Sequence, residues 1–297
     1  MGDDGGISRR ALLTGGAALG ALLAAGGVGA AVEWDNPTFV RLRGGCGSTP
    51  GLPHSSYAVT NGTINSAAMR ATLPWSVALP PGHSAGDGTP LLLCLPGRGS
   101  GPDAVLHAEG IPAWASAGGY RFAIATPGGG AATYWHPRRT GIDPLRYLVD
   151  DFIPMVEQRF GVGGDRQHRA AIGWSMGGFG VLLLAQQQRD LLGAVAAMSP
   201  AVFPSYSDAL SGHPDTFDSA ADWQRYGLWN HLADLRGTPV RIDCGGADPF
   251  APTARMLLRR VPGAVGGITS GCHDNSFWRR TTPKALRFLA SHLSGQI

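Results

Sequence analysis

Short apolar runs alternate with segments of helical spacing along most of this 297-residue chain. The run Leu91–Leu95 is apolar at every position, which is typical of a strand buried on both faces. This alternation predicts an α/β fold with one mostly parallel central sheet and helices on both faces. We expect strands at residues 69–79, 91–95, 120–125, 169–173, 194–198, 239–243 and 266–269, and helices at residues 143–160, 177–188, 252–260 and 284–293.

Two segments interrupt this alternation. Residues 31–65 are rich in Gly, Ser and Asn, and we expect them to be irregular. Residues 201–237 are polar and aromatic-rich, and we place them as an insertion after the sixth strand of the fold. Long ordered loops of this kind often form lids or substrate walls. We therefore expect a single domain over residues 66–297 that carries the insertion.

The first thirty residues have the features of an export signal. Arg9 and Arg10 precede an uncharged stretch at residues 11–32, which resembles a twin-arginine (Tat-type) signal. Small residues at 28–30 suggest cleavage after Ala30. The alternative is a retained anchor with a transient membrane contact, because more than 18 uncharged residues can span a bilayer. We expect an exported protein, extracellular or in the cell envelope, with its signal at residues 1–30.

The charges and cysteines exclude several classes of partner. The formal net charge is +3, and the arginines are scattered as singles and pairs rather than gathered in a stripe. We therefore expect no nucleic-acid partner. Cys46, Cys94, Cys244 and Cys272 have none of the spacings typical of a metal site, so we expect no metal.

The strongest chemical motif is Gly173–Gly177, which matches G-x-S-x-G. It lies between the strand expected at 169–173 and the helix expected at 177–188, which is the context that a nucleophile elbow needs. In a chain with 45 glycines the pentapeptide alone is weak evidence, so the strand–turn–helix context carries the argument. We expect Ser175 to be the nucleophile.

A serine hydroxyl needs a base to take its proton. In folds with this elbow the acid and then the histidine follow the serine along the chain. His231 lies in the insertion and His292 in the last helix, whereas His273 lies between the strand at 266–269 and that helix. We expect His273 to be the base.

The acid belongs on the loop after the preceding strand. Asp243 ends that strand, Asp248 lies within the loop, and Asp274 is adjacent to the histidine and badly placed to hold it. We expect Asp248 to fix the imidazole tautomer, and Asp243 to shape the turn. The oxyanion donors are expected at the backbone N–H groups of Met176 and Arg98.

Export would permit disulfides. Cys244 and Cys272 each lie a few residues from a candidate catalytic residue, so the two could pair if their loops meet. Two buried free thiols are the alternative, and the sequence does not decide between them.

Five motifs carry a family resemblance that runs from about residue 65 to residue 295. They are Tyr134–Arg138, Gly173–Gly180, Ser199–Ala201, Asp248–Phe250, and Gly271–Asp274 together with Phe277–Arg279. With them the chain resembles the secreted putative-esterase family of α/β-hydrolases, which includes esterase D-like enzymes, enterochelin-type esterases and antigen 85 mycolyltransferases. The resemblance implies an α/β-hydrolase fold, the triad Ser175, Asp248 and His273, oxyanion donors at Arg98 and Met176, and no cofactor.

Four aromatic residues lie beside these motifs, and they could wall an acyl pocket or pack in the core: Trp135, Trp174, Phe250 and Trp278. His136 precedes the serine and is expected to fix a loop. We therefore expect an exported serine esterase that acts on a small-molecule or lipid ester. The alternatives are an acyltransferase of the same fold, similar to the mycolyltransferases, and a non-catalytic surface protein.

Overall fold

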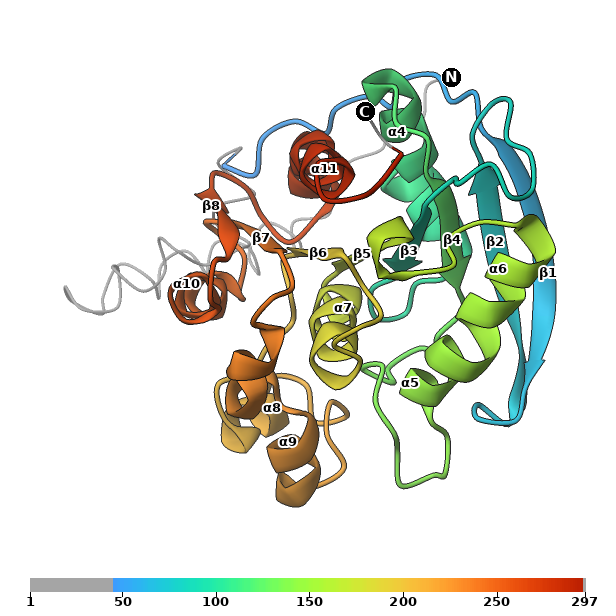
Figure 1. Ribbon diagram of the computed structural model, residues 1–297. Helices are drawn as coiled ribbons and strands as arrows, with labels where there is room; N and C mark the ends of the chain where they lie inside the picture. The colour runs from blue at the N-terminus through green and yellow to red at the C-terminus, as the bar shows by residue number, and fades with distance from the viewer. Residues whose placement is uncertain (1–44, 296–297) are drawn as a thin grey trace, which may run out of the picture.

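The computed structural model describes residues 45–295, which contain one eight-stranded sheet of order β1-β2-β4-β3-β5-β6-β7-β8 (Figure 1). β1 pairs with β2, and β2 with β4, in antiparallel fashion, and every other pair is parallel. The strands are β1 (Ala58–Ser66), β2 (Ala71–Leu79), β3 (Leu91–Leu95), β4 (Ala123–Pro127), β5 (Arg169–Trp174), β6 (Ala194–Met198), β7 (Val240–Gly245) and β8 (Val265–Thr269). The expected α/β-hydrolase fold with a mostly parallel sheet is confirmed.

Helices cover both faces of the sheet (Figure 1). The α-helices are α4 (Ile111–Gly118), α5 (Pro144–Arg146), α6 (Ile153–Phe160), α7 (Met176–Gln187), α8 (Tyr206–Gly212), α9 (Ala220–Tyr226), α10 (Ala251–Arg260) and α11 (Asn275–Ala290). The short π- and 3-10-helices are η1 (Ala104–Ala108), η2 (Tyr147–Phe152), η3 (Arg166–His168) and η4 (Leu228–Leu235). Residues of α4 and α11 pack on one face, and residues of α6, α7 and α10 on the other.

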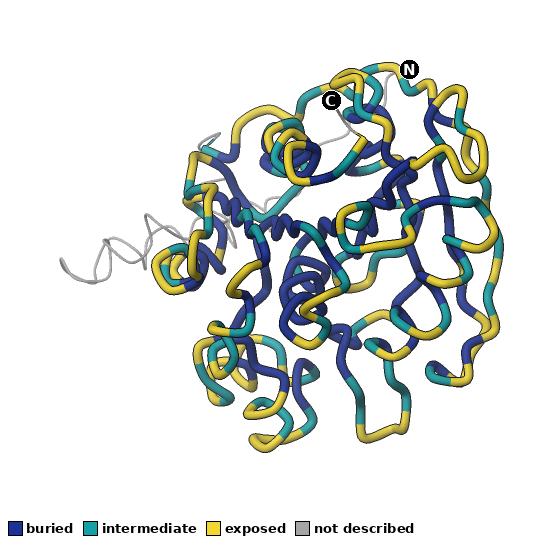
Figure 2. Tube along the Cα trace, viewed as in Figure 1, coloured by how far each residue is buried: buried dark blue, intermediate teal, exposed yellow. Residues whose placement is uncertain are grey.

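The core lies along the central strands (Figure 2). β3 and β6 are buried at all positions, because helices cover both of their faces. In α7, 11 of 12 residues are buried, and a helix that is apolar on all sides belongs inside a protein. The segment that follows Ser175 is therefore fixed by packing on every side.

The expectation of an irregular segment up to residue 65 is wrong for its last part. Residues 58–65 belong to β1, an edge strand that pairs only with β2. Most of its residues are exposed or half-buried, so it needs few apolar side chains. Thr and Asn on its faces hide the alternation that would have revealed a strand.

Of the two alternatives left open for Cys244 and Cys272, a disulfide between them is not formed. Cys272 forms a disulfide with Cys46, with 5.0 Å between the two Cα atoms. Cys244 and Cys94 are buried free thiols. Cys244 lies in β7 and packs into the core cluster shared with α7 and α10, while Cys272 is already paired with Cys46.

No helix among residues 45–295 is long and apolar enough to cross a membrane. The export signal expected at residues 1–30 lies outside the described part of the chain. The insertion at residues 201–237 lies between β6 and β7 and contains α8, α9 and η4.

Candidate active site

The turn between β5 and α7 holds Ser175 in a backbone conformation that side-chain-bearing residues rarely adopt, with φ 54° and ψ −115°. Two close backbone approaches require glycine beside it. A Cβ atom on Gly177 would lie 1.8 Å from the carbonyl oxygen of Leu95, and one on Gly173 would lie 2.1 Å from that of Gly177. The expected nucleophile elbow is therefore present, with Ser175 at its apex.

Three of the predicted residues form one hydrogen-bonded chain. Nε2 of His273 lies 2.9 Å from Oγ of Ser175, and Nδ1 of the same ring lies 2.8 Å from Oδ2 of Asp248. The Asp248 side chain has no exposed surface (0%), and its other oxygen accepts a 2.8 Å hydrogen bond from the backbone N–H of Phe250. With Nδ1 protonated, Nε2 is free to accept the serine proton, which is the arrangement of a Ser-His-Asp triad.

The loops that carry the acid and the base are joined to each other. The N–H of Gly246 donates to the carbonyl of Thr269 at 2.7 Å, and the N–H of Ala247 donates to that of Gly271 at 2.9 Å. These bonds extend the pairing of β7 and β8 beyond the ends of the strands. The acid and the base are thus held in a fixed relation by backbone.

The competing carboxylates have other partners. Asp243 is bonded to Arg241 at 2.6 and 2.9 Å, and burial raises the pKa of Asp243. Asp274 caps α11 by accepting a 3.0 Å hydrogen bond from the backbone N–H of Ser276. Neither carboxylate is the one bonded to the imidazole of the triad.

The other histidines that the sequence brought into consideration also have separate roles. His136 is fully buried, and its ring nitrogens lie 2.9 Å from the carbonyl of Pro137 and 2.8 Å from that of Thr216. The expectation that His136 fixes a loop is confirmed. His231 and His292 bond to backbone carbonyls of their own neighbourhoods, at 3.2 and 2.8 Å.

The two segments that carry the expected oxyanion donors lie beside the nucleophile. Met176 is the first residue of α7, and the first N–H groups of a helix have no partner within it. A Cβ atom on Gly97 would lie 3.6 Å from the Cβ of Ser175, so the loop after β3 approaches the elbow closely. Arg98 is the next residue of that loop, and the role of its backbone N–H as an oxyanion donor stays a prediction.

Two of the four aromatic residues flank the triad. The rings of Phe250 and Trp278 lie 5.4 and 5.2 Å from the ring of His273, measured between centroids. Nε1 of Trp278 donates to the hydroxyl of Ser199 at 3.1 Å, which fixes the indole. Of the four aromatic residues, these two are therefore the ones that lie beside the imidazole.

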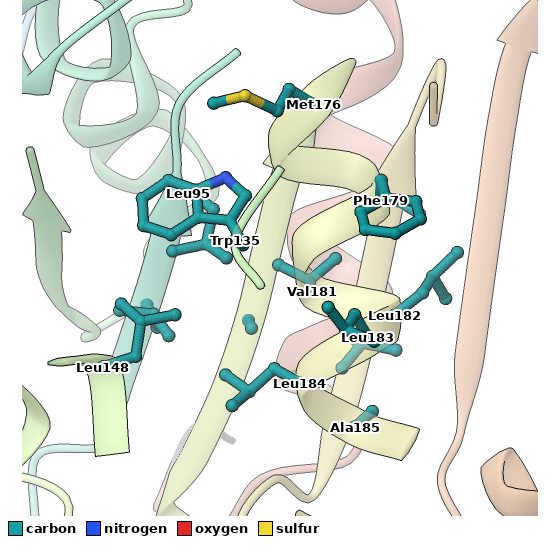
Figure 3. Close-up of a cluster of buried hydrophobic side chains, with 14 of the residues drawn as sticks. Leu95, Trp135, Leu148, Met176, Phe179, Val181, Leu182, Leu183, Leu184 and Ala185 are labelled. Atoms are coloured by element: carbon teal, nitrogen blue, oxygen red, sulfur yellow. The ribbon is translucent and has the colours of Figure 1, made fainter. Parts of the chain in front are cut away.

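The pocket role expected for Trp135 and Trp174 does not fit the structure, because both side chains are fully buried (0% exposed). Trp135 packs against Leu95 and α7 (Figure 3), where a Cβ on Gly180 would lie 2.3 Å from its ring. Trp174 packs in the cluster on the other face of the sheet. Adjacency to a motif does not reveal the direction of a side chain, and here both indoles point into the core.

The insertion adds residues that sequence reasoning missed. The Arg98 guanidinium forms an ion pair with Asp215, although both side chains remain partly exposed (46% and 39%). His213 stacks on Phe250 at 6.3 Å between ring centroids, and Phe250 in turn contacts the imidazole of His273. Burial lowers the pKa of His213, and the charge of Arg98 lowers it further. The segment that contains His213 and Asp215 reaches the site only through the fold of the insertion, so the sequence does not reveal it.

A second ion pair fastens the insertion to the loop after β4. Arg138 donates to both carboxylate oxygens of Asp218, at 3.2 and 2.8 Å, and to the carbonyl of Asp215 at 2.9 Å. The backbone N–H of Arg139 adds a 2.6 Å bond to Asp218. Mainly through Arg138, these bonds lower the pKa of Asp218 to about 2. We call the Arg138–Asp218 pair the insertion clasp.

The described residues contain one group with metal-ligand spacing, Cys46, Cys272 and Asp274. The disulfide uses both sulfurs, which leaves a single carboxylate. One carboxylate is too few ligands to hold a metal ion.

Comparison with protein families gives one match over most of the domain. The family model described as "Putative esterase" matches residues 66–262. This range contains Ser175 and Asp248 and ends before His273.

Several solved structures have similar folds, and this chain covers nearly the whole length of each of them. A ferulic acid esterase matches with a TM-score of 0.64 and 23% identity, over 79% of this chain and 100% of its own. An S-formylglutathione hydrolase from Agrobacterium tumefaciens matches with 0.68 and 17%, over 81% and 97%. MPT51 of Mycobacterium tuberculosis matches with 0.61 and 16%, over 79% and 99%. At these identities the likeness establishes the shared fold.

Proposed function

Because this chain belongs to the Putative esterase family, we propose that it is a serine esterase that hydrolyses carboxylic esters through an acyl-enzyme. The observation that carries the proposal is the unbroken chain from Ser175 Oγ through the imidazole of His273 to Asp248, with 2.9 and 2.8 Å between successive atoms. Each of the three side chains thus has the hydrogen-bond partner that nucleophilic catalysis requires.

In the proposed acylation step, Oγ of Ser175 attacks the ester carbonyl while its proton passes to Nε2 of His273. The imidazolium that forms is stabilised by the buried carboxylate of Asp248. The carbonyl oxygen becomes an oxyanion that accepts hydrogen bonds from the N–H groups of Met176 and Arg98, each of which accelerates such a step by about 10²–10³-fold.

Collapse of this intermediate breaks the bond to the alcohol oxygen, which leaves with the proton from Nε2 of His273. A water molecule then gives its proton to the same nitrogen and attacks the acyl carbon. The acid is released and Ser175 regains its proton. The triad thus returns to its starting state, and the reaction consumes only ester and water.

The exported location expected from residues 1–30 fits this function, and we include it in the proposal. The Cys46–Cys272 disulfide supports it, since stable disulfides persist mainly in oxidising compartments outside the cytosol. The substrate would then be a small-molecule or lipid ester met outside the cell.

Ester hydrolysis by Ser175→Ala tests the proposal. With p-nitrophenyl acetate and butyrate as substrates, we expect this variant to lose at least about 10³-fold in kcat. The matched control is Ser207→Ala on α8, an exposed serine outside the triad, which should keep the parent rate. Equal hydrolysis by Ser175→Ala and the parent protein would contradict the proposal.

A further inference from the structure

The segment that precedes β1 is fastened to the loop that carries the catalytic base. We call residues 45–50 the strap; it lies at the blue end of the chain near β8 and α11 (Figure 1). Cys46 of the strap forms the disulfide with Cys272, and Cys272 is the residue directly before His273. A covalent bond thus reaches within one residue of the base.

Arg280 on α11 reinforces this connection. Its guanidinium donates to the carbonyl oxygens of Cys46 at 3.0 Å, Ser48 at 3.1 Å and Ser270 at 3.1 Å. The hydroxyl of Ser276 also donates to the Cys46 carbonyl at 2.9 Å. The Arg280 side chain therefore joins the strap to the loop that precedes the base.

The loop that carries the base needs such support more than the loop that carries the nucleophile. β8 is the last strand of the sheet, it pairs only with β7, and its residues are exposed or half-buried. The loop then passes through Gly271 at φ +152°, a conformation that favours glycine. Because glycine has no side chain, this residue restricts the backbone of the loop little. Ser175, in contrast, follows a strand with neighbours on both sides and precedes a buried helix.

We propose that Arg280 and the Cys46–Cys272 disulfide are positioning elements for His273, holding its Nε2 at the distance from Ser175 that proton transfer requires. This inference rests on the proposed esterase function. Catalytic groups work only when held within about 0.5 Å of the productive geometry. Loss of the strap contact therefore slows the chemical step while the surfaces that bind the ester stay in place.

The test compares full-chain variants with the parent in p-nitrophenyl butyrate hydrolysis. For Arg280→Gln and for Cys46→Ser combined with Cys272→Ser, we expect kcat to fall about 10-fold or more, with KM within twofold of the parent. Labelling by a fluorophosphonate, which also needs the base, should slow by a similar factor. Arg280→Lys should recover part of kcat, because an ammonium can still donate to some of the three carbonyls.

The matched control is Arg287→Gln, which removes the same charge from an exposed position on the same helix and should keep the parent kcat. Thermal unfolding of every variant is recorded, and kinetics are measured well below each midpoint. A lower midpoint with an unchanged kcat would mean that the strap only stabilises the fold, and it would overturn the inference. If the double cysteine variant does not fold, the comparison of Arg280→Gln with Arg280→Lys tests the inference alone. A parent protein without esterase activity would instead overturn the proposed function.

Discussion

The triad and the insertion meet at one site but are held in different ways. Ser175 is fixed by backbone, through glycine contacts at the elbow and strands on either side, and the loops of its partners are joined by backbone hydrogen bonds, with the strap as further support for the base loop. The insertion at residues 201–237 packs into the core through Phe217, Tyr226 and Leu228, and two ion pairs, the clasp and Arg98–Asp215, join its polar turn to the loops around the site.

This difference separates chemistry from recognition. Backbone contacts hold the reacting atoms closely, whereas an ion pair between partly exposed side chains, such as Arg98–Asp215, contributes little free energy and tolerates rearrangement. We therefore expect changes near the triad to act on kcat, and changes in the insertion to act on KM and stability.

The largest effect is expected from Gly177→Ala. The new Cβ would overlap the Leu95 carbonyl oxygen, 1.8 Å away, so the elbow must shift and Ser175 loses its place above the sheet. We expect kcat/KM for p-nitrophenyl butyrate to fall at least about 10³-fold. Gly51→Ala is the control, because a Cβ there meets no atom within 4 Å. Parent-like activity in Gly177→Ala would show that the elbow is not rigid.

Asp248→Asn should have the next largest effect. The amide cannot hold the imidazole in the tautomer that accepts the serine proton, and the corresponding change in a known triad lowers kcat by about 10⁴-fold. We expect a loss of about 10³–10⁴-fold in kcat with little change in KM. Asp190→Asn, an exposed carboxylate outside the site, is the control. A loss below tenfold would assign the acid role elsewhere.

Asp218→Asn breaks the insertion clasp and should affect stability more than chemistry. We expect the free energy of unfolding to fall by about 1–2 kcal/mol, since hydrogen bonds to charged groups contribute about that much, and KM to rise several-fold with kcat retained. Urea unfolding and steady-state kinetics measure the two. A kcat loss as large as that of Asp248→Asn would erase the distinction between the regions.

The clasp also predicts a pH dependence. The pKa of Asp218 is lowered from 3.8 to about 2 in the folded protein, so its contribution is complete above about pH 4 and is lost as the pH falls through 2. After solvent screening this amounts to about 1 kcal/mol. Asp218→Asn should therefore lose less stability than the parent between pH 4 and pH 2. Equal losses would show that the pair is not formed in solution.

The smallest effect is expected from Asp215→Asn. It releases the partly exposed Arg98 side chain, while the backbone N–H of Arg98, the expected oxyanion donor, stays in place. We expect a change of no more than about threefold in KM and an unchanged kcat. A large fall in kcat would mean that the ion pair itself positions the oxyanion loop.

The hydrogen-bonded arrangement of Ser175, His273 and Asp248 could be predicted from the sequence because their order follows from topology. The glycines around Ser175 mark the elbow, and the ends of β7 and β8 determine where Asp248 and His273 lie. The contacts that escaped prediction join distant segments: Cys46 and Cys272 are 226 residues apart, and His213 reaches the site only through the path of the insertion. Trp135 was misplaced because its backbone, at φ 57°, turns its side chain in a way that neighbouring residues do not reveal.

The central claim is that Ser175 is a nucleophile activated by His273, and covalent labelling tests it most directly. The parent protein is treated with a fluorophosphonate, digested, and analysed by mass spectrometry. We expect one label per chain on the peptide that contains Ser175, and at least about 10³-fold slower labelling in His273→Ala. A folded parent protein that takes up no label, or takes it up on another residue, would contradict the account.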